Sequence, residues 1–373
     1  MKNNSAVQKL CELDKPFSNS IEREKLFLEA IKENYAFQSQ KQPYINFLAK
    51  QRGFSIEDIN SIEDLAKIPP LFVGIMKINT FCNFEMEDIA MVLTSSGTKG
   101  QKTQSFFDTP ALDRLSSMAY SCFEASGWTS QTPSHFFVMG YDIREEKNLG
   151  TSWSNNQFLA LAPNKSVNWT ILKNDKGEFE FDYKHWAQKV VELGADAPIR
   201  FTGFPAFISQ LAYEVANIAP GFRAKEGSFV TAGGGWKNHK GATLTQKEFA
   251  TLMEHSMGIP PASIRDTFGM AEHGVPFCSC PEGNYHIPIY SRVLIREPLS
   301  LKVLHNGEEG LMNLITPYNL AQPNISVLAT DLAVVKDNCP CGLEGNYVAS
   351  IRRGGISKHR GCAIAAQELL DKQ

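Results

Sequence analysis

A loop of small, hydroxyl and lysine residues stands between an apolar run and an aromatic pair. The run is 89–93, the pair is Phe106 and Phe107, and residues 93–108 read LTSSGTKGQKTQSFFD. Small residues expose backbone N–H groups, hydroxyls add donors, and Lys99 and Lys102 add positive charge, so the loop suits a phosphate group. The P-loop of nucleotide triphosphatases is excluded, because that motif has four residues between its glycines and then Lys-Ser/Thr. Here Gly97 and Gly100 are only three positions apart, so the sequence predicts a phosphate loop of another kind.

Three further segments place glycines or ionisable residues after predicted strands. Gly233, Gly234 and Gly235 follow the run 228–232, which indicates either a sharp turn or a backbone that lets a flat group approach. The run 263–268 ends in GMAEHG, so Glu272 and His273 come just past the carboxyl end of a predicted strand, where open α/β sheets bind ligands. Asp331 follows the run 325–328 and could equally be a ligand-binding acid, a turn residue or a helix cap.

Cysteines in two C-x-C pairs, together with one histidine, form a candidate metal site. Cys278 and Cys280 precede His286, and the second pair, Cys339 and Cys341, lies in another turn-rich segment. Sulfur and imidazole ligands of this number favour tetrahedral zinc, although C-x-C spacing is tighter than the usual C-x₂-C knuckle. We predict a structural zinc bound by Cys280, His286, Cys339 and Cys341, with Cys278 in reserve. The alternative is a set of four reduced, buried thiols.

The elements that must position these residues alternate between helix and strand. Apolar spacing predicts a helix over 21–38, a second over 110–125 beginning at Pro110, and a third beginning near Thr245 at a Thr-Gln-Lys-Glu capping box. Strands are predicted at 135–141, 178–183, 199–204, 228–232, 264–268, 287–296, 301–304, 311–316 and 325–328. Alternation up to about residue 270 predicts an α/β fold with a parallel sheet and covering helices. The later strands follow one another through turns, which predicts a smaller antiparallel C-terminal sheet.

Composition excludes several classes of protein. The 373 residues carry a net charge of −3, which argues against a nucleic-acid binder with a basic face. No apolar run is long enough for a membrane span, and the N-terminal residues have no apolar signal-peptide core. Eight cysteines without such a signal fit a reducing, cytoplasmic location.

The glycine-marked loops together resemble the adenylate-forming superfamily, which includes acyl-CoA synthetases, luciferases and peptide-synthetase adenylation domains. The resemblance implies that the phosphate loop, which binds ATP, comprises Thr94, Ser95, Ser96, Gly97, Thr98, Lys99, Gly100 and Lys102. Gly233, Gly234 and Gly235 match the adenine-side loop, and 268–272 match the aromatic-Gly-x-Thr-Glu signature through Phe268, Gly269 and Glu272, with Ala271 in place of threonine. Asp331 matches the acid that holds the ribose, and Arg352 the arginine some twenty residues beyond it. Five motifs in the family's order make this resemblance specific.

The C-terminal residues are similar to those of the acyl-protein synthetases of bacterial bioluminescence, the LuxE-type fatty-acid–luciferin-component ligases. Other adenylate-forming enzymes continue into a mobile lid that carries a lysine, whereas this chain ends soon after Arg352 and carries Cys362 instead. The resemblance implies that a fatty acid is adenylated, transferred to Cys362 as a thioester and passed to a protein acceptor such as a reductase or carrier protein. Lys358, His359 and Arg360 would lower the pKa of that thiol. The plainer interpretation of Cys362 is a small apolar residue on a terminal helix.

The chemistry of such a reaction assigns further roles. Mg²⁺ on Glu272 would offset the charge of the triphosphate, and Lys237, two positions after the last glycine, would replace the missing lid lysine. The resemblance divides the chain into an N-terminal helical region (1–64), an adenylate-forming core (65–335) and a truncated lid segment (336–373). Two other functions remain open: an acid–CoA or acid–carrier-protein ligase of the phenylacetate–CoA ligase type, and a non-catalytic nucleotide-binding scaffold subunit.

Overall fold

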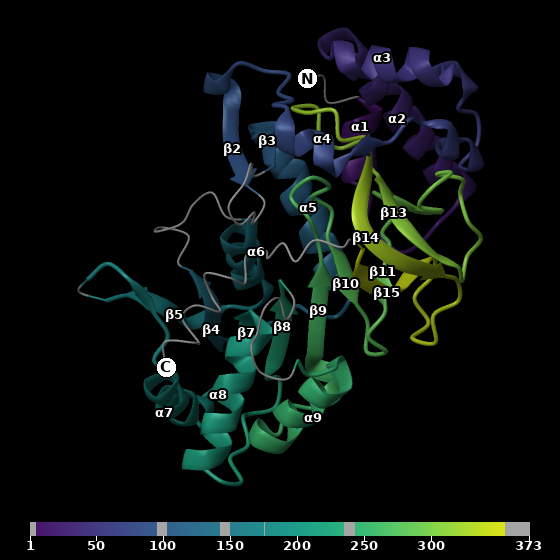
Figure 1. The fold of residues 1–373 in the computed structure, drawn as a ribbon. Helices are drawn as coiled ribbons and strands as arrows, with labels where there is room; N and C mark the ends of the chain where they lie inside the picture. Colours follow the sequence, from purple (N-terminus) through teal and green to yellow (C-terminus); the bar gives the residue numbers. More distant parts are fainter. Residues whose placement is uncertain (1–4, 95–102, 142–149, 175, 235–242, 355–373) are drawn as a thin grey trace.

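A single mixed sheet organises the protein. The computed structural model describes residues 5–94, 103–141, 150–174, 176–234 and 243–354. Within these ranges thirteen strands belong to one sheet, and two more form a separate hairpin (Figure 1). In the same ranges, each helix is either too short or too polar to cross a bilayer.

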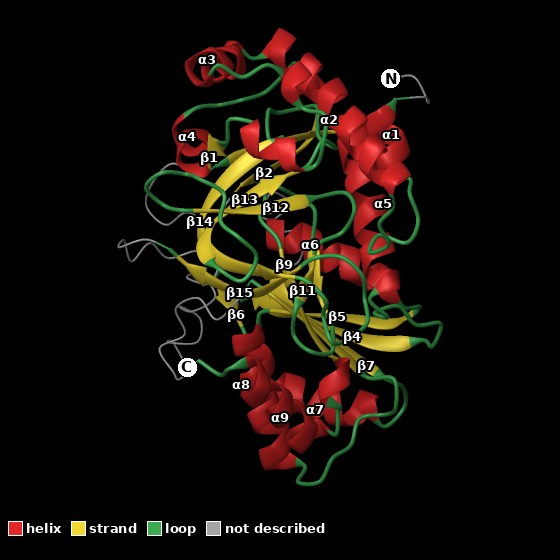
Figure 2. Cartoon of the chain, turned by 90° about the vertical axis from the view of Figure 1, so that its right-hand side faces the viewer, coloured by secondary structure: helices red, strands yellow, loops and turns green. Residues whose placement is uncertain are grey.

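One half of the sheet is parallel, as the alternation of helix and strand predicted. Its strands, in spatial order, are β5 (Asn164–Lys173), β4 (Ser134–Tyr141), β7 (Ile199–Gly203), β8 (Phe229–Gly233) and β9 (Ile264–Phe268). All eight residues of β4 are buried, as expected of a strand covered on both faces. Figures 1 and 2 show three helices gathered below this half: α7 (Tyr183–Gly194), α8 (Pro205–Ile218) and α9 (Gln246–Met257). Another helix, α6 (Gly150–Phe158), contacts β4 and β7.

The other half is antiparallel and continues from β9 without a break. Its strands, in spatial order, are β10 (Phe277–Ser279), β11 (Tyr285–His286), β15 (Tyr347–Arg353), β14 (Ser326–Lys336), β13 (Glu309–Ile315) and β12 (Arg292–Arg296). At the margins β1 (Leu71–Phe72) pairs with β14, and β6 (Phe179–Glu180) with β5. The separate hairpin consists of β2 (Ile89–Thr94) and β3 (Gln104–Asp108).

The three predicted helices are confirmed, and their caps explain where they begin. The first is α2 (Ile21–Lys41), capped by Ser20, and the second is α5 (Thr109–Ala125), capped by Asp108 with proline in its first turn. At the start of α9 the Thr245–Glu248 capping box is present in both directions. The remaining helices are α1 (Ala6–Cys11), α3 (Pro43–Arg52) and α4 (Val73–Ile78). Short 3₁₀ turns lie at η1 (Ile56–Asp58), η2 (Glu63–Lys67), η3 (Met86–Asp88), η4 (Leu159–Leu161) and η5 (Pro261–Ser263).

Several strand predictions were wrong in part. The predicted strand 178–183 is only the two residues of β6, because the Asp182 side chain accepts from the His185 amide and starts α7. The predicted strand 287–296 begins only at Arg292, the first residue of β12. Pro288 lies in the part that is not a strand, and it has no N–H to donate to a neighbouring strand. Residues 301–304 form only an isolated bridge, because Leu301 has φ +58°, which is incompatible with a strand.

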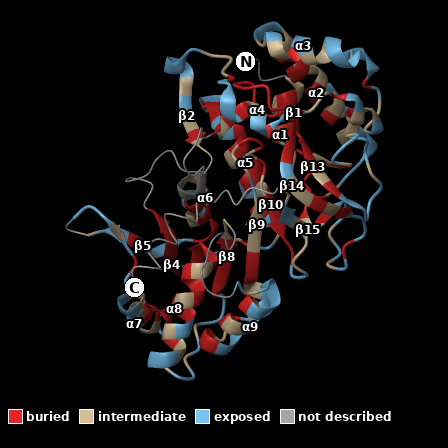
Figure 3. Cartoon of the chain, viewed as in Figure 1, coloured by how far each residue is buried: buried red, intermediate tan, exposed pale blue. Residues whose placement is uncertain are grey.

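The two largest hydrophobic cores of the described residues lie on opposite faces of the parallel half of the sheet. One fills the space between α7–α9 and the parallel strands. The larger core joins α1, α2 and α5 to strands of both halves, so the N-terminal helices pack as part of the main body. In Figure 3 buried residues run through the strands of both halves, whereas exposed residues follow the outer faces of α3 and α9.

A buried segment between β13 and β14, residues 317–325, is held by side chains of α2. All nine of its residues are buried. The side-chain amide of Asn34 donates to the carbonyls of Pro317 (2.6 Å) and Asn319 (2.9 Å). Gln38 donates in the same way to the carbonyl of Gln322 at 3.0 Å. Buried carbonyls need such partners, so α2 stabilises a segment almost three hundred residues away.

Replacing Asn34 by leucine is expected to destabilise the fold strongly. Leucine fills a similar volume but leaves two buried carbonyls without donors, which predicts a loss of about 2–4 kcal/mol in the free energy of unfolding. Chemical denaturation would measure this loss. The control is Asn46→Leu, which removes an exposed hydrogen bond to the Ser39 carbonyl and should cost less than about 0.5 kcal/mol. Equal losses in the two variants would contradict this role of Asn34.

Candidate active site and metal centre

The carboxyl ends of four parallel strands meet in close backbone contact. Gly203, the last residue of β7, has φ +114°, and an added Cβ would lie 2.3 Å from the Met139 carbonyl oxygen of β4. Gly234, directly after β8, has φ +79°, and a Cβ there would lie 2.8 Å from the ring of Phe204. Side chains are therefore excluded at both glycines: Gly203 is buried against β4, whereas Gly233 and Gly234 are partly exposed. Ligands of open α/β sheets bind at this kind of edge.

The predicted aromatic-Gly-x-x-Glu loop lies beside the glycine loop. Gly233 of β8 is the register partner of Thr267 in β9, the residue before Phe268. Beyond Gly269, Glu272 is 4% exposed, and its carboxylate has no hydrogen bond or ion pair among the described residues. A buried carboxylate without a protein partner requires a cation or ordered water, so this position fits the predicted Mg²⁺ ligand.

The hairpin that flanks the predicted phosphate loop is anchored to the same part of the molecule. Thr94 ends β2 and pairs with Gln104 of β3. The backbone of Phe106 in β3 receives a hydrogen bond from the Asn319 side chain and donates one to the Gln322 side chain, both at 3.1 Å. In the same buried segment, the side-chain amide of Asn324 donates to the Glu272 carbonyl at 3.0 Å. Residues 317–325 thus hold both the hairpin and the Glu272 loop.

Several predicted site residues lie outside the part of the chain that the structure describes. These are Ser95, Ser96, Gly97, Thr98, Lys99, Gly100, Lys102, Gly235, Lys237 and Cys362. Their roles remain predictions.

Asp331 and Arg352 are not brought together by the strand pairing. Asp331 lies inside β14, not after its end, which corrects the prediction that the strand stops before it. Its register partner is Arg353, whereas Arg352 is opposite Leu332. Successive side chains alternate between the faces of a sheet, so Asp331 shares a face with Arg353. Arg352 lies on the other face, where it makes a two-point ion pair with Glu309 (2.5 and 2.7 Å).

His273, next to Glu272, is buried in an uncharged form. It is 1% exposed, its Nε2 lies 3.0 Å from the Ser291 hydroxyl, and its Nδ1 has no hydrogen-bond partner among the described residues. Burial lowers the pKa of His273 to about 3. The imidazole is therefore neutral at pH 7, and the Glu272 loop gains no positive charge from it.

This burial predicts a pH dependence of stability. The unfolded chain takes up a proton on His273 near its ordinary pKa of 6.5, whereas the folded chain does so only near 3. The stabilising contribution is thus complete above pH 6.5 and is lost as the pH falls, by about 1 kcal/mol per pH unit between pH 6 and pH 5. His273→Gln, which keeps a donor for Ser291, should reduce the slope of unfolding free energy against pH by that amount. An unchanged slope would contradict a neutral, buried His273.

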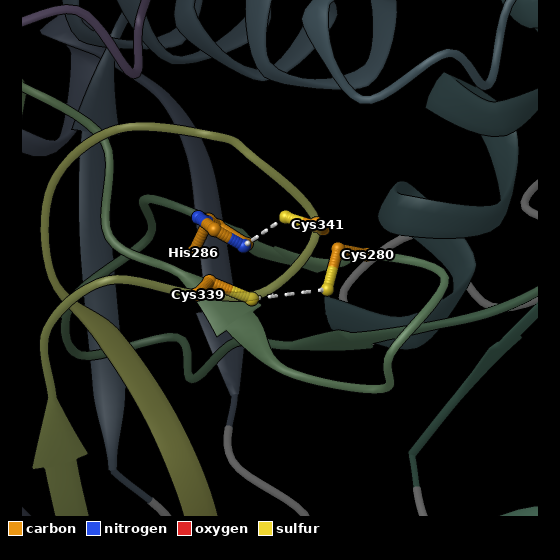
Figure 4. A group of neighbouring side chains, drawn as sticks. All are labelled: Cys280, His286, Cys339 and Cys341. Atoms are coloured by element: carbon orange, nitrogen blue, oxygen red, sulfur yellow. Dashed lines mark hydrogen bonds between the residues drawn. The ribbon is translucent and has the colours of Figure 1, made fainter.

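The predicted metal ligands lie together at one point of the antiparallel half. The ligand atoms of Cys280, His286, Cys339 and Cys341 all lie within 4.8 Å of one another (Figure 4). The sulfurs of Cys280 and Cys339 are 3.7 Å apart, and Cys341 Sγ is 3.2 Å from His286 Nε2. In tetrahedral zinc, Zn–S bonds of about 2.3 Å separate two sulfurs by about 3.8 Å, so the observed distance fits a shared metal.

The surroundings of this Cys/His cluster also suit a metal. Burial lowers the pKa of His286 to about 4, so its imidazole is neutral and able to coordinate. The Asn284 side chain donates to Cys339 Sγ at 3.3 Å and the Leu343 amide to Cys341 Sγ at 3.4 Å, which stabilises thiolates. Cys278, the reserve ligand, packs into the main hydrophobic core and is not part of the cluster.

Several residues that support the site were not predicted from the sequence. Residues 317–325 carry Asn319, Gln322 and Asn324, and the signal was a group of amide side chains between two apolar strands. Gly203 was also missed, although a glycine before Phe-Pro at the end of a predicted strand is a recognisable turn signal.

Comparisons with known proteins agree with this arrangement. The family described as "Acyl-protein synthetase, LuxE" matches residues 3–371. The chain is 24% identical to the long-chain-fatty-acid–luciferin-component ligase of Aliivibrio fischeri over 99% of this chain and 95% of that protein. It is 25% identical to the protein of the same name from Vibrio harveyi over 82% of this chain and 79% of that protein.

Solved structures agree on the fold. An open conformation of 2-hydroxyisobutyryl-CoA ligase with 2-HIB-AMP and CoA has a TM-score of 0.66 at 14% identity, covering 90% of this chain and 75% of that one. The same ligase in its postadenylation state has a TM-score of 0.70 at 14% identity, covering 91% and 69%. These similarities confirm the predicted adenylate-forming fold, and the family match confirms the predicted ligase class. The chain belongs to the LuxE family of acyl-protein synthetases.

Proposed function

We propose that the protein activates a long-chain fatty acid with ATP and transfers the acyl group to its own Cys362. The family supports this function, because its curated members are named long-chain-fatty-acid–luciferin-component ligases. The observation that carries the proposal is the buried Glu272 carboxylate, unpaired among the described residues, beside the meeting carboxyl ends of the parallel strands. The acyl group would then pass to a protein acceptor such as a reductase or a carrier protein.

In the first step the chain holds ATP and the acid in line. Backbone N–H groups and lysines of residues 94–102 would bind the triphosphate, and the open backbones of Gly233 and Gly234 would accept the flat adenine beside Phe268. Asp331 would bind the ribose hydroxyls from the face of the sheet that it shares with Arg353, opposite to Arg352. A carboxylate oxygen of the acid forms a bond to the α-phosphorus as the bond to the bridging oxygen breaks and pyrophosphate leaves. Glu272 would hold Mg²⁺, which would neutralise charge at the phosphates, and Lys237 would supply a further cation that assists adenylation.

In the second step a thiolate displaces AMP. Cys362 Sγ forms a bond to the acyl carbon, the bond from that carbon to the AMP oxygen breaks, and AMP leaves with the electron pair. The thiol proton passes to solvent beforehand, which the nearby Lys358, His359 and Arg360 would favour by stabilising the thiolate. The thioester keeps the acyl group activated for its acceptor.

Two assays test the proposal. Exchange of labelled pyrophosphate into ATP that depends on a fatty acid would report adenylation. Label from the acid that remains on the denatured protein and is released by hydroxylamine would report the thioester. Acyl-CoA in solution with an unlabelled protein would indicate an acid–CoA ligase instead. Folded protein that binds ATP but shows no exchange would indicate a nucleotide-binding scaffold.

We further propose that the Cys/His cluster binds one structural Zn²⁺. Three sulfurs and one imidazole nitrogen within 4.8 Å of one another form a complete tetrahedral ligand set, which leaves no open position for catalysis. Elemental analysis of protein purified without chelators should therefore give close to one zinc per chain. Less than about a tenth of an equivalent would exclude a zinc site.

A further inference from the structure

The two halves of the sheet are joined by unusually short ladders. Three consecutive ladders connect them, β9–β10, β10–β11 and β11–β15, and each consists of two residue pairs. The ladders on either side are longer, with four pairs between β8 and β9 and six between β14 and β15. We call these three ladders the joint. Because they contain few backbone hydrogen bonds, the sheet is expected to open first at the joint.

The Cys/His cluster crosses this joint. Cys280 directly follows β10, His286 lies in β11, and Cys339 and Cys341 lie in the turn between β14 and β15. Cys280 and Cys339 are 59 positions apart in the sequence, so one metal would close a long loop. A link of this kind restricts the separated strands more than a contact between neighbours in sequence would.

A buried arginine connects the cluster to the parallel half. Arg265 of β9 is 6% exposed, makes no ion pair among the described residues, and has no hydrogen-bond partner at Nε within them. β9 and β10 are antiparallel and pair Thr267 with Cys278, so two residues further along this register Arg265 lies toward Cys280. Zinc with three thiolates and a neutral imidazole carries one net negative charge, which is the counter-charge that Arg265 otherwise lacks.

We propose that the metal centre and Arg265 together hold the joint and so align the parallel and antiparallel halves of the sheet. This inference rests on the zinc proposed above. The glycine loop and the Glu272 loop follow parallel strands, whereas Asp331 lies on antiparallel β14. The joint therefore sets the relative position of the two parts of the proposed nucleotide site. Loss of the metal should weaken nucleotide binding without unfolding the parallel half.

Hydrogen exchange on the full-length protein tests the joint directly. Zinc-loaded protein, protein stripped by a chelator under reducing conditions, and stripped protein with zinc restored would be compared. Stripping should reduce protection of β11 and β15 amides by roughly ten- to a hundred-fold and that of β4 and β7 amides by less than about three-fold. Restored zinc should restore protection, and the stripped protein should bind ATP more weakly.

Variants separate the joint from a general loss of stability. Arg265→Met should accelerate zinc loss to a chelator by roughly ten-fold or more, and Arg265→Lys should largely prevent this because it keeps the charge. Cys82→Ser, which changes a thiol outside the cluster, should behave as wild type. If stripping zinc reduces protection equally in all strands, or leaves protection at β11 and β15 unchanged, the proposed role of the joint is wrong even though the protein binds zinc. Absence of zinc would overturn both metal proposals, and pyrophosphate exchange would still report adenylation independently.

Discussion

Cys362→Ser protein is expected to form acyl-AMP at close to the wild-type rate but to retain no acyl group. Serine keeps the size of the side chain, but its hydroxyl is not ionised at neutral pH and is a poor nucleophile without an adjacent base. Label from a fatty acid on the denatured protein should therefore fall at least about a hundred-fold, while fatty-acid-dependent pyrophosphate exchange changes by less than about three-fold.

A matched cysteine variant guards against indirect effects. Cys82→Ser changes a partly exposed thiol whose Sγ donates to the Phe84 carbonyl at 3.3 Å, a bond that a serine hydroxyl can also make. It should retain full labelling and exchange. Wild-type labelling in Cys362→Ser would show that another residue of the chain accepts the acyl group.

Glu272→Gln is expected to lower pyrophosphate exchange by roughly a hundred- to a thousand-fold. The amide keeps the shape of the side chain but removes the negative charge that we assign to Mg²⁺ binding. Because the carboxylate is 4% exposed and unpaired among the described residues, its removal should leave thermal stability of the metal-free protein unchanged or raised. Activity and stability should thus move in different directions.

That combination distinguishes a metal-binding carboxylate from a structural one. Glu282→Gln, ten positions further on and exposed, is the control and should change neither quantity. A Glu272→Gln protein that is destabilised and loses activity in proportion would indicate a structural role. Full exchange activity in a stable Glu272→Gln protein would exclude Glu272 from the reaction.

The parallel half of the fold could be predicted because its signals are local. The predicted strand 264–268 matches β9 at both ends although it contains Arg265 and Asp266, and the Thr245–Glu248 capping box marks the start of α9. The four residues of the Cys/His cluster were also predictable, since C-x-C pairs and a histidine in turns are a typical pattern of metal ligands. The position of Glu272, just past the carboxyl end of a strand, was likewise predictable from the glycine-marked loop that follows residue 268.

Long-range pairing determines what could not be predicted. Thr330 and Asp331 interrupt the apolar pattern of β14, yet the strand continues to Lys336 because β13 and β15 pair with it on both sides. The same register puts Arg353, not Arg352, on the face of Asp331, and only the pairing reveals which residue faces which side. No local pattern indicates that residues 317–325 are buried, or that the side chains of Asn34 and Gln38 donate to their carbonyls.

The mass of the intact protein after incubation with ATP, Mg²⁺ and a long-chain fatty acid tests the central claim most directly. A gain of one acyl group per chain is expected, dependent on ATP, reversed by hydroxylamine and absent in Cys362→Ser. An unchanged mass in folded, ATP-binding protein under conditions that consume the fatty acid or ATP would contradict acyl transfer to the chain's own cysteine.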